Sequence, residues 1–343
     1  MGKKLISVWL SFVLLLVSGI SIYAGQSSYA QFLNRNIYIN GVQFQNYHLT
    51  NPFVLYDNVT YIPLNTEMSQ ILGFTAKMDW ESRTLELVKK KPAKTKPDSS
   101  ALKSNLQNVP VSEAKNVTAV VRAGKEKSKV TFSTYSLLKA GNTLYLPVRA
   151  LTGNSCFGWT AYYDDYSGVY LSTSPSVSAY SFFDRKESDL NRGLTQYILQ
   201  KNGNLAKAYA LNLVFIFKHE ADVSKQSVTL LMAMAEKEST FRADAVGGGG
   251  STGLLQIKVS TAKGYGYTAA DLKAPHKNVE LGAKILSRNA ATFGTTEKAL
   301  AAYNQGAGAV SRGKMRNGYY SRVLDAQANL NSYLAKNGYG TGK

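Results

Sequence analysis

Residues 235–257 read AEKESTFRADAVGGGGSTGLLQI and contain two glutamates, four consecutive glycines and a short apolar run with a glutamine. On a helix that begins near Ser227, positions i, i+3, i+4, i+7 and i+10 share one face. That face is apolar except for one glutamate, and it carries Leu231, Met234, Ala235, Glu238 and Phe241. The helical phase therefore places Glu238 on the apolar face, and it predicts that Glu236 is exposed and points away.

A carboxyl group among apolar side chains is partly desolvated, which raises its pKa and keeps it protonated near neutral pH. Such a group can donate a proton to a leaving oxygen, as the general acid does in glycoside cleavage. A glutamate on an apolar helix face can equally be a half-exposed residue at the end of a helix. These residues alone therefore leave Glu238 as a candidate acid.

The four glycines, residues 247–250, are followed by Ser-Thr-Gly and lack the Lys-Ser/Thr pair of a phosphate-binding loop. We expect them to turn the chain back, so that residues 253–256 come beside Glu238.

From about residue 178 onward, apolar residues recur with the 3.6-residue period of helices. The clearest segments are 205–217, 228–241, 279–289 and 296–303. This half of the chain is predicted to be helical, with residues 176–213 forming a helical leader.

The preceding half contains an internal repeat. Residues 58–64, NVTYIPL, parallel residues 142–148, NTLYLPV, and both copies continue into Gly-aromatic-Thr-Ala and a short closing strand. Short strand-like runs and polar turns predict two small β-rich modules, at residues 31–90 and 111–175. Residues 91–110 are basic, contain prolines and are predicted to be a solvated linker. The expected fold class is therefore α+β and multidomain.

Residues 1–30 combine two lysines, an apolar stretch and small polar residues, which is typical of an export signal. Cleavage after Ala30 fits the small residues at Ser28 and Ala30. The apolar stretch is also close to the roughly 20 residues of a membrane span, so an uncleaved N-terminal anchor is the alternative. Either outcome predicts a secreted or envelope protein.

The composition limits the classes of partner. Forty Lys and Arg against 22 Asp and Glu give the 343-residue chain a formal charge of +18, which favours anionic wall polymers or a membrane surface. No nucleic-acid-binding motif accompanies this charge, and no nucleic acid partner is expected. The single cysteine, Cys156, excludes an intrachain disulfide.

Four short motifs follow one another in the second half of the chain. They are ESTF at 238–241, GLLQI at 253–257, AYNQG at 302–306 and YYSRV at 319–323. Together they resemble the soluble lytic transglycosylases, and Asn278, Val279 and Gly282 resemble the start of a helix in that family. The resemblance implies an all-α, goose-lysozyme-like fold in the domain at 214–343. It also implies cleavage of the β-1,4 bond between N-acetylmuramic acid (MurNAc) and N-acetylglucosamine (GlcNAc) in peptidoglycan glycan strands.

The same resemblance implies roles for individual residues. Glu238 matches the single catalytic acid and base, and the neighbouring Ser239 helps to hold the site and is assigned to substrate binding. The other implied substrate-binding residues are Gln256, Tyr303, Asn304 and Tyr319. Leu255, Ile285, Gln305 and Tyr320 depart from the family's usual residues. The apolar changes at Leu255 and Ile285 put subsite preference in doubt more than activity, and Gln305 could add a hydrogen bond to the ligand.

A lytic mechanism needs no second carboxylate, because the 6-hydroxyl of MurNAc can attack its own anomeric carbon and leave a 1,6-anhydro end. Asp244 and Glu280 are the candidates for a second acid by sequence distance, but a polar loop and a helix start favour a solvated or helix-dipole role for them. A hydrolytic muramidase of the same fold, in which water attacks instead of the 6-hydroxyl, is the nearest alternative. An inactive wall-binding or assembly protein is the other alternative. No cofactor and no metal site are expected.

The repeated β-rich segments resemble the small module in the N-terminal region of copper amine oxidases. The resemblance does not imply copper, because a copper site needs clustered imidazoles and His48 is the only histidine near these segments. An attachment or spacer role is expected for the two modules.

Overall fold

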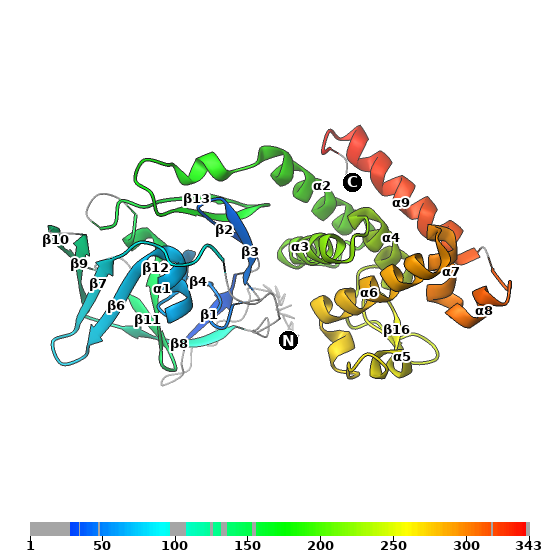
Figure 1. The fold of residues 1–343 in the computed structure, drawn as a ribbon, viewed down its shortest axis with the longest axis horizontal. Coiled ribbons are helices and arrows are strands. Elements are labelled where there is room, and N and C mark those ends of the chain that lie inside the picture. The colour runs from blue at the N-terminus through cyan, green and yellow to red at the C-terminus, as the bar shows by residue number, and fades with distance from the viewer. Residues whose placement is uncertain are drawn as a thin grey trace, which may run out of the picture. The chain divides into compact units, whose positions relative to one another are not determined.

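The computed structural model describes residues 28–33, 35–46, 49–96, 108–123, 126–131, 136–152, 156–316 and 318–340. Most of the predicted export segment and half of the predicted linker lie outside these residues. The chain forms two compact units, shown in Figure 1. The first unit comprises Met1–Leu33, Leu49–Ala93 and Ala101–Phe157, and the second comprises Asn34–His48, Lys94–Ser100 and Gly158–Lys343. Within the described ranges, no helix is both long and apolar enough to cross a membrane.

A closed barrel forms the centre of the first unit, with strands in the order β1-β4-β5-β12-β11-β8. The strands are β1 (Ser28–Phe32), β4 (Val54–Tyr56), β5 (Val59–Pro63), β8 (Val109–Ala114), β11 (Leu137–Ala140) and β12 (Thr143–Pro147). The two Tyr-x-Pro repeats pair with each other, with Tyr61 opposite Pro147 and Tyr145 opposite Pro63. Both tyrosines are buried in the barrel core. The repeat therefore builds one barrel from both copies.

The first strand of this barrel begins inside the predicted export segment. Ser28, Tyr29 and Ala30 pair with residues of β8, and Ala30 is fully buried in the barrel core. Cleavage after Ala30 would remove these three residues from the barrel.

A second sheet of the first unit has the order β10-β9-β7-β6. Its strands are β6 (Phe74–Asp79), β7 (Thr84–Lys89), β9 (Thr118–Ala123) and β10 (Glu126–Thr131). β7, from the first copy of the repeat, runs parallel to β9, from the second. Before β6, helix α1 (Thr66–Leu72) begins at Asn65, whose side chain accepts the Met68 N–H, and ends at Gly73 with φ 75°. The second copy has only the 3-10 turn η2 (Val148–Ala150) at this place.

The sheet of the second unit also combines the two copies. Its order is β13-β14-β2-β3, from β13 (Thr160–Asp164), β14 (Gly168–Ser172), β2 (Asn36–Ile39) and β3 (Val42–Gln45). β14 runs parallel to β2. Gly168 has φ 134°, and a Cβ there would lie 2.1 Å from the Asn36 carbonyl oxygen, so this pairing requires glycine. The predicted modules at 31–90 and 111–175 therefore share all three of these sheets.

The helical region confirms the predicted fold class, α+β with a β-rich N-terminal part and a helical C-terminal part. After η3 (Ala179–Phe182), its helices are α2 (Arg185–Lys201), α3 (Lys207–Ser224), α4 (Val228–Ser239), α5 (Val259–Lys263), α6 (Pro275–Phe293), α7 (Thr296–Gln305), α8 (Ala307–Ser311) and α9 (Gly318–Lys336). Two short strands, β15 (Ser251–Thr252) and β16 (Ile257–Lys258), and the 3-10 turn η4 (Asp271–Lys273) lie between α4 and α6.

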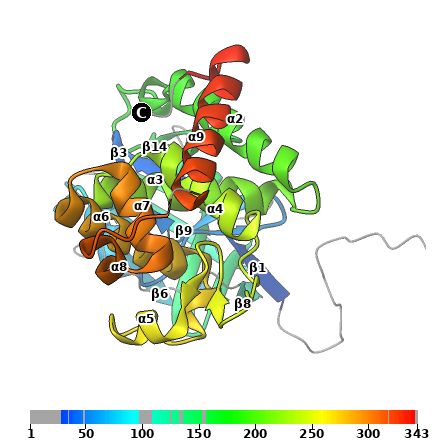
Figure 2. The same ribbon diagram turned by 90° about the vertical axis from the view of Figure 1, so that its right-hand side faces the viewer.

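Helix α4 lies at the centre of the helical region. Its residues from Val228 to Glu236 are all buried, because α3 and α9 pack against it (Figure 2). Leu231, Met234 and Ala235 join a core cluster that also includes residues of α2, α3, α6, α7 and α9. A helix buried on nearly all sides is a rigid support for a polar side chain at its end.

Helix α2 is hydrogen-bonded to the sheet of the second unit. Ser188 donates to Asp164 at 2.7 Å, and the Asn191 amide donates to the Tyr166 carbonyl at 2.9 Å. The predicted helical leader is thus bound on its N-terminal side to a β-sheet of the same unit.

Candidate active site

Glu238 lies in the last turn of α4, where the buried helix meets solvent. Leu231, Met234 and Ala235, which the helical phase places on its face, are fully buried, and Glu238 itself is half-buried. Burial raises the pKa of the Glu238 carboxyl, and the opposing effects of Tyr319 and Arg322 do not cancel this rise. The carboxyl therefore keeps its proton to a higher pH than an ordinary glutamate does.

The neighbours of this carboxyl come from the start of α9. The Tyr319 ring is buried, and its hydroxyl is close enough to Glu238 to stabilise the carboxylate and lower its pKa. Within the described part of the chain, however, this hydroxyl completes no hydrogen bond of ordinary length and angle. Arg322, exposed on the next turn of α9, also lowers the pKa of Glu238 through its charge.

Asn278, on α6, holds the loop that follows the glycine run. Its side chain is fully buried and accepts the Leu255 N–H at 2.8 Å. The same amide donates to the carbonyls of Thr252 and Leu272, both at 2.9 Å. Gly253 has φ 83°, and a Cβ there would lie 2.3 Å from the Asn278 amide nitrogen. A side chain at position 253 would therefore disrupt this packing.

Two predicted substrate-binding residues attach to this loop through their hydroxyls. Ser239, next to Glu238, is 4% exposed and donates to the Leu254 carbonyl at 2.8 Å. Tyr303, on α7, donates to the Leu255 carbonyl at 3.0 Å. Burial and the charge of Glu238 both raise the pKa of Tyr303 well above its ordinary value. These contacts connect α4, α7 and the loop around Glu238.

The glycine run makes a tight reversal of the chain. Gly247 donates its N–H to the Ser251 carbonyl at 2.8 Å, and Gly249 and Gly250 have φ values of 96° and 78°. Gln256 lies close to this turn. Its amide nitrogen donates to the carbonyls of Ala245 and Gly253, at 3.0 and 2.9 Å. Both amide hydrogens are thus used within the loop, and the Gln256 oxygen accepts from Ser251 at 2.8 Å.

The predicted site residues therefore differ in how they relate to Glu238. Tyr303 and Tyr319 are electrostatically coupled to Glu238, whereas Ser239 and Gln256 direct their polar atoms to backbone or loop groups. Asn304 is exposed on α7 and has no hydrogen bond from its side chain to the described residues.

The prediction that Glu236 is exposed was wrong. Its side chain is 7% exposed because α2 covers it. Tyr197 of α2 donates to Glu236 at 2.7 Å, Lys237 at 2.9 Å, and Lys201 lies 3.4 Å away. Burial alone would raise the pKa of Glu236, but these hydrogen bonds and positive charges hold it below its usual value. Glu236 is thus a paired, ionised residue within the packing between helices.

The residues of α2 that bind α4 were not singled out from the sequence. Besides Tyr197 and Lys201, Asn202 at the end of α2 donates to the Thr240 carbonyl at 2.9 Å. Thr240 and Phe241 both have positive φ, 52° and 61°, an unusual backbone for a β-branched and an aromatic residue. Tyr197 and Lys201 share a helix face by their i, i+4 spacing, but no signal in the sequence identifies α4 as what that face contacts.

Asp244 and Glu280, the candidates for a second acid, lie in other surroundings. Asp244 is exposed and acts on Tyr209 through its charge. Glu280 is exposed on α6 and interacts with Tyr267 and Glu220. Neither is among the groups that shift the pKa of Glu238. In the described ranges, no three His, Cys, Asp or Glu side chains are grouped so that they could hold a metal ion.

Comparisons with known proteins match this region. Residues 215–323 match the family model of the transglycosylase SLT domain. This segment, from α3 to the first turns of α9, contains Glu238 and all the predicted substrate-binding residues, and α2 lies outside it.

Solved structures of two lytic transglycosylases are also similar to the chain. The 70-kDa soluble enzyme of Escherichia coli is 21% identical, with 46% of this chain and 30% of that chain covered and a TM-score of 0.29. An inactive mutant of the lytic transglycosylase Slt of Pseudomonas aeruginosa is 22% identical, with 48% and 32% covered and a TM-score of 0.30. The chain thus spans about a third of the length of these structures.

Proposed function

We propose that the protein is a peptidoglycan lytic transglycosylase, with Glu238 as its single catalytic acid and base. The observation that carries this proposal is a half-buried glutamate with a raised pKa, at the end of a buried helix inside the transglycosylase SLT match. The substrate is the β-1,4 bond between MurNAc and GlcNAc. Because this polymer lies outside the cytoplasm, we also propose that the protein is secreted or held in the cell envelope.

The first step uses the protonated form of Glu238. Its proton passes to the glycosidic oxygen while the bond between that oxygen and the anomeric carbon of MurNAc breaks. The raised pKa of Glu238 supports this role, because the carboxyl must carry the proton when substrate binds. Tyr319 and Arg322, which both favour the carboxylate, would then stabilise the charge that develops on Glu238.

The second step uses the carboxylate. The MurNAc 6-hydroxyl oxygen attacks the anomeric carbon, its proton returns to Glu238, and the product carries a 1,6-anhydro ring. Because the nucleophile belongs to the substrate, the step needs no second carboxylate and no metal. Neither Asp244 nor Glu280 is among the groups that shift the pKa of Glu238, which supports this single-acid route.

The test is digestion of purified peptidoglycan, with the products weighed by mass spectrometry. We expect anhydro-muropeptides from the unaltered chain and none from Glu238→Gln. Glu280→Gln is the matched control, because it removes the carboxylate of an exposed candidate acid, and it should keep the activity. Products heavier by one water, with ordinary reducing ends, would instead identify a hydrolytic muramidase. No product from the unaltered chain would favour an inactive wall-binding or assembly protein.

A further inference from the structure

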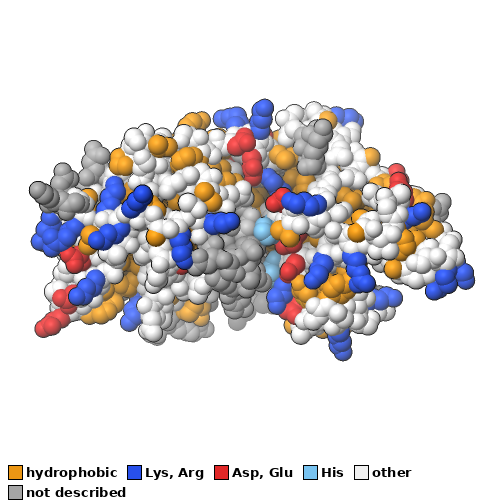
Figure 3. All heavy atoms as spheres, viewed as in Figure 1, with side chains coloured by type: hydrophobic (Ala, Val, Ile, Leu, Met, Phe, Trp, Pro, Cys, Tyr) orange, Lys and Arg blue, Asp and Glu red, His pale blue; other side chains and the backbone are white. Residues whose placement is uncertain are grey.

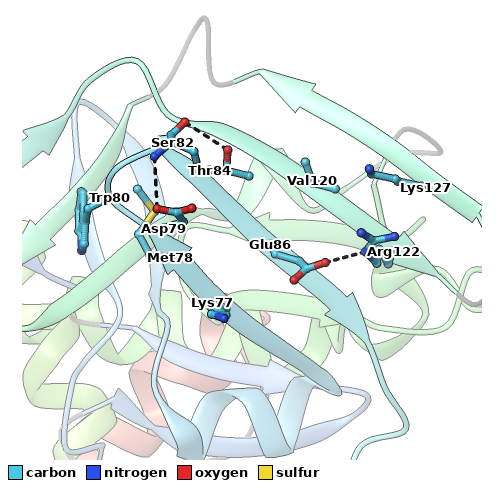
Figure 4. Close-up of a pocket in the computed structure, with 10 residues that line it drawn as sticks. All are labelled: Lys77, Met78, Asp79, Trp80, Ser82, Thr84, Glu86, Val120, Arg122 and Lys127. Atoms are coloured by element: carbon cyan, nitrogen blue, oxygen red, sulfur yellow. Dashed lines mark hydrogen bonds and ion pairs between the residues drawn. The ribbon is translucent and has the colours of Figure 1, made fainter.

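The sheet β10-β9-β7-β6 of the first unit has a groove on one face. The groove is open to solvent and has a volume of about 530 Å³. The residues drawn in Figure 4 line it, with Trp80 at one end and Lys127 at the other. Four strands about 4.8 Å apart give the face a width of about 14 Å, which suits a segment of a polymer better than one small molecule.

Strand register brings the polar residues of this groove onto one face. Lys77 on β6 lies opposite Glu86 on β7, and Arg122 on β9 lies opposite Lys127 on β10. Leu85, which alternates with these positions, is fully buried on the other face of the sheet. The groove face is therefore mostly polar, with Val120 and Met78 as its aliphatic lining, whereas Leu85 and Leu87 of β7 are directed to the core.

The two acidic groups in the groove are engaged locally. Glu86 accepts from the Arg122 guanidinium at 2.6 Å, and Asp79 accepts the backbone N–H groups of Glu81 and Ser82 at 3.0 and 3.2 Å. Lys77 and Lys127 are exposed, and neither forms an ion pair of ordinary length with a carboxylate of the described residues, although after the hydrogen bonds from Ser82 the charge of Lys77 also helps to lower the pKa of Asp79. The groove thus carries two lysines whose charge is available to an anionic ligand.

Trp80 adds an aromatic surface at one end of the groove. Its side chain is 47% exposed, and Lys139 lies with its ammonium 5.3 Å from the ring centroid. An exposed indole ring offers a flat apolar surface to the face of a sugar ring, and the nearby ammonium adds another positive charge. A ring-stacking surface beside unpaired cations fits a glycan that bears carboxylates.

We propose that this groove is a non-catalytic binding site for peptidoglycan glycan strands, with sugar rings on Trp80 and peptide-stem carboxylates on Lys77 and Lys127. The choice of polymer rests on the proposed function, because it is the same polymer that Glu238 would cleave. A polyol-phosphate wall polymer could pair its phosphates with the lysines. Its backbone contains no sugar ring, however, that could stack on the Trp80 indole. The role of the first unit would then be to hold the enzyme on insoluble wall.

The experiment measures binding without turnover. The full chain carrying Glu238→Gln is titrated against insoluble peptidoglycan that has been stripped of its phosphate polymers, and the unbound protein is quantified. Adding Trp80→Ala should weaken binding about fivefold or more, because the proposed stacking contact between the indole ring and a sugar ring is lost. The double change Lys77→Glu and Lys127→Glu should weaken it further and reduce its sensitivity to salt.

Matched controls separate this groove from general surface effects. Tyr163 is 48% exposed in the second unit, so Tyr163→Ala removes an equally exposed aromatic ring, and Lys115→Glu reverses an exposed charge of the first unit outside the groove. Both should leave binding unchanged. Unchanged binding by the groove variants would overturn the proposal, as would a loss confined to wall that still carries phosphate polymers.

Activity assays keep this result separate from the proposed function. With active Glu238 restored, the groove variants should digest short soluble glycan fragments at the normal rate and insoluble wall more slowly. An inactive unaltered chain with groove-dependent binding would refute the proposed function and leave the binding site standing.

Discussion

Replacing Glu220 with glutamine should stabilise the protein at neutral pH. Glu220, on α3, is 8% exposed, its Oε1 lies 3.9 Å from His219 Nε2, and Glu280 on α6 faces it with a like charge. Burial first, and then the charge of Glu280, raise its pKa from 4.5 to about 8. The proposed mechanism does not use this carboxyl, so stability and activity can change independently.

The magnitude follows from proton linkage. At pH 7 the unfolded chain ionises this group, whereas the folded chain keeps it mostly protonated, which costs the folded state about 3 kcal/mol. Glu220→Gln removes this cost, but desolvation of the buried glutamine amide itself costs about 1 kcal/mol. The net gain in stability is therefore about 2 kcal/mol. Because a folded pKa above the unfolded pKa reduces stability as pH rises, the gain should grow between pH 4.5 and 8. Below pH 4.5 both states are protonated, so the ionisation difference vanishes and only the loss of about 1 kcal/mol from the glutamine amide should remain.

The assay is calorimetric unfolding of the unaltered chain and Glu220→Gln at pH 4, 5.5, 7 and 8.5. At pH 7 a gain of about 2 kcal/mol corresponds to a rise in Tm of roughly 4–8 °C for a unit of this size. Glu297→Gln, which removes an exposed carboxylate on α7, is the control and should change stability by less than about 0.5 kcal/mol. A gain of equal size at pH 4, or none at pH 7, would refute the reasoning.

Three further substitutions test the contacts of α4 and of the loop that follows the glycine run. Tyr319→Phe removes a group that lowers the pKa of Glu238, so this pKa should rise and the alkaline limb of the kcat/KM profile should move to higher pH, as pH–rate measurements would show. Tyr197→Phe removes a hydrogen bond to the buried Glu236 carboxylate and should destabilise the protein by about 1.5–3 kcal/mol in urea unfolding. Asn278→Ala leaves the Leu255 N–H and two carbonyl groups without their hydrogen-bond partner. It should lower the free energy of unfolding by about 3 kcal/mol in the same assay. It should also lower kcat, although Glu238 keeps its place on α4.

Much of the site was predictable from local pattern. Helical phase alone assigned Glu238 to the apolar face of its helix, and the family resemblance named Tyr303 and Tyr319, whose pKa values burial and the charge of Glu238 raise. The glycine run was predicted as a turn, and its positive φ angles show why glycine suits it. Such predictions succeed because periodicity and turn chemistry depend on neighbours within a few residues along the chain.

Other features were decided by contacts between distant segments. The phase that predicted the environment of Glu238 also predicted an exposed Glu236, yet Tyr197, 39 residues away, covers and binds that side chain. The repeat predicted two modules, but parallel pairing of β14 with β2 and of β7 with β9 combines the copies.

By itself, then, the sequence determined which face of α4 is apolar, where the chain turns, and that the N-terminal half is β-rich and the C-terminal half helical. Only the tertiary structure decided that α2 binds α4, that Gln256 directs its amide into its own loop, and that strands of both copies share their sheets. The physical reason is that the pattern of apolar and polar residues predicts only which side of its own helix or strand each residue lies on. Which element packs against that face depends on the assembly of the whole unit.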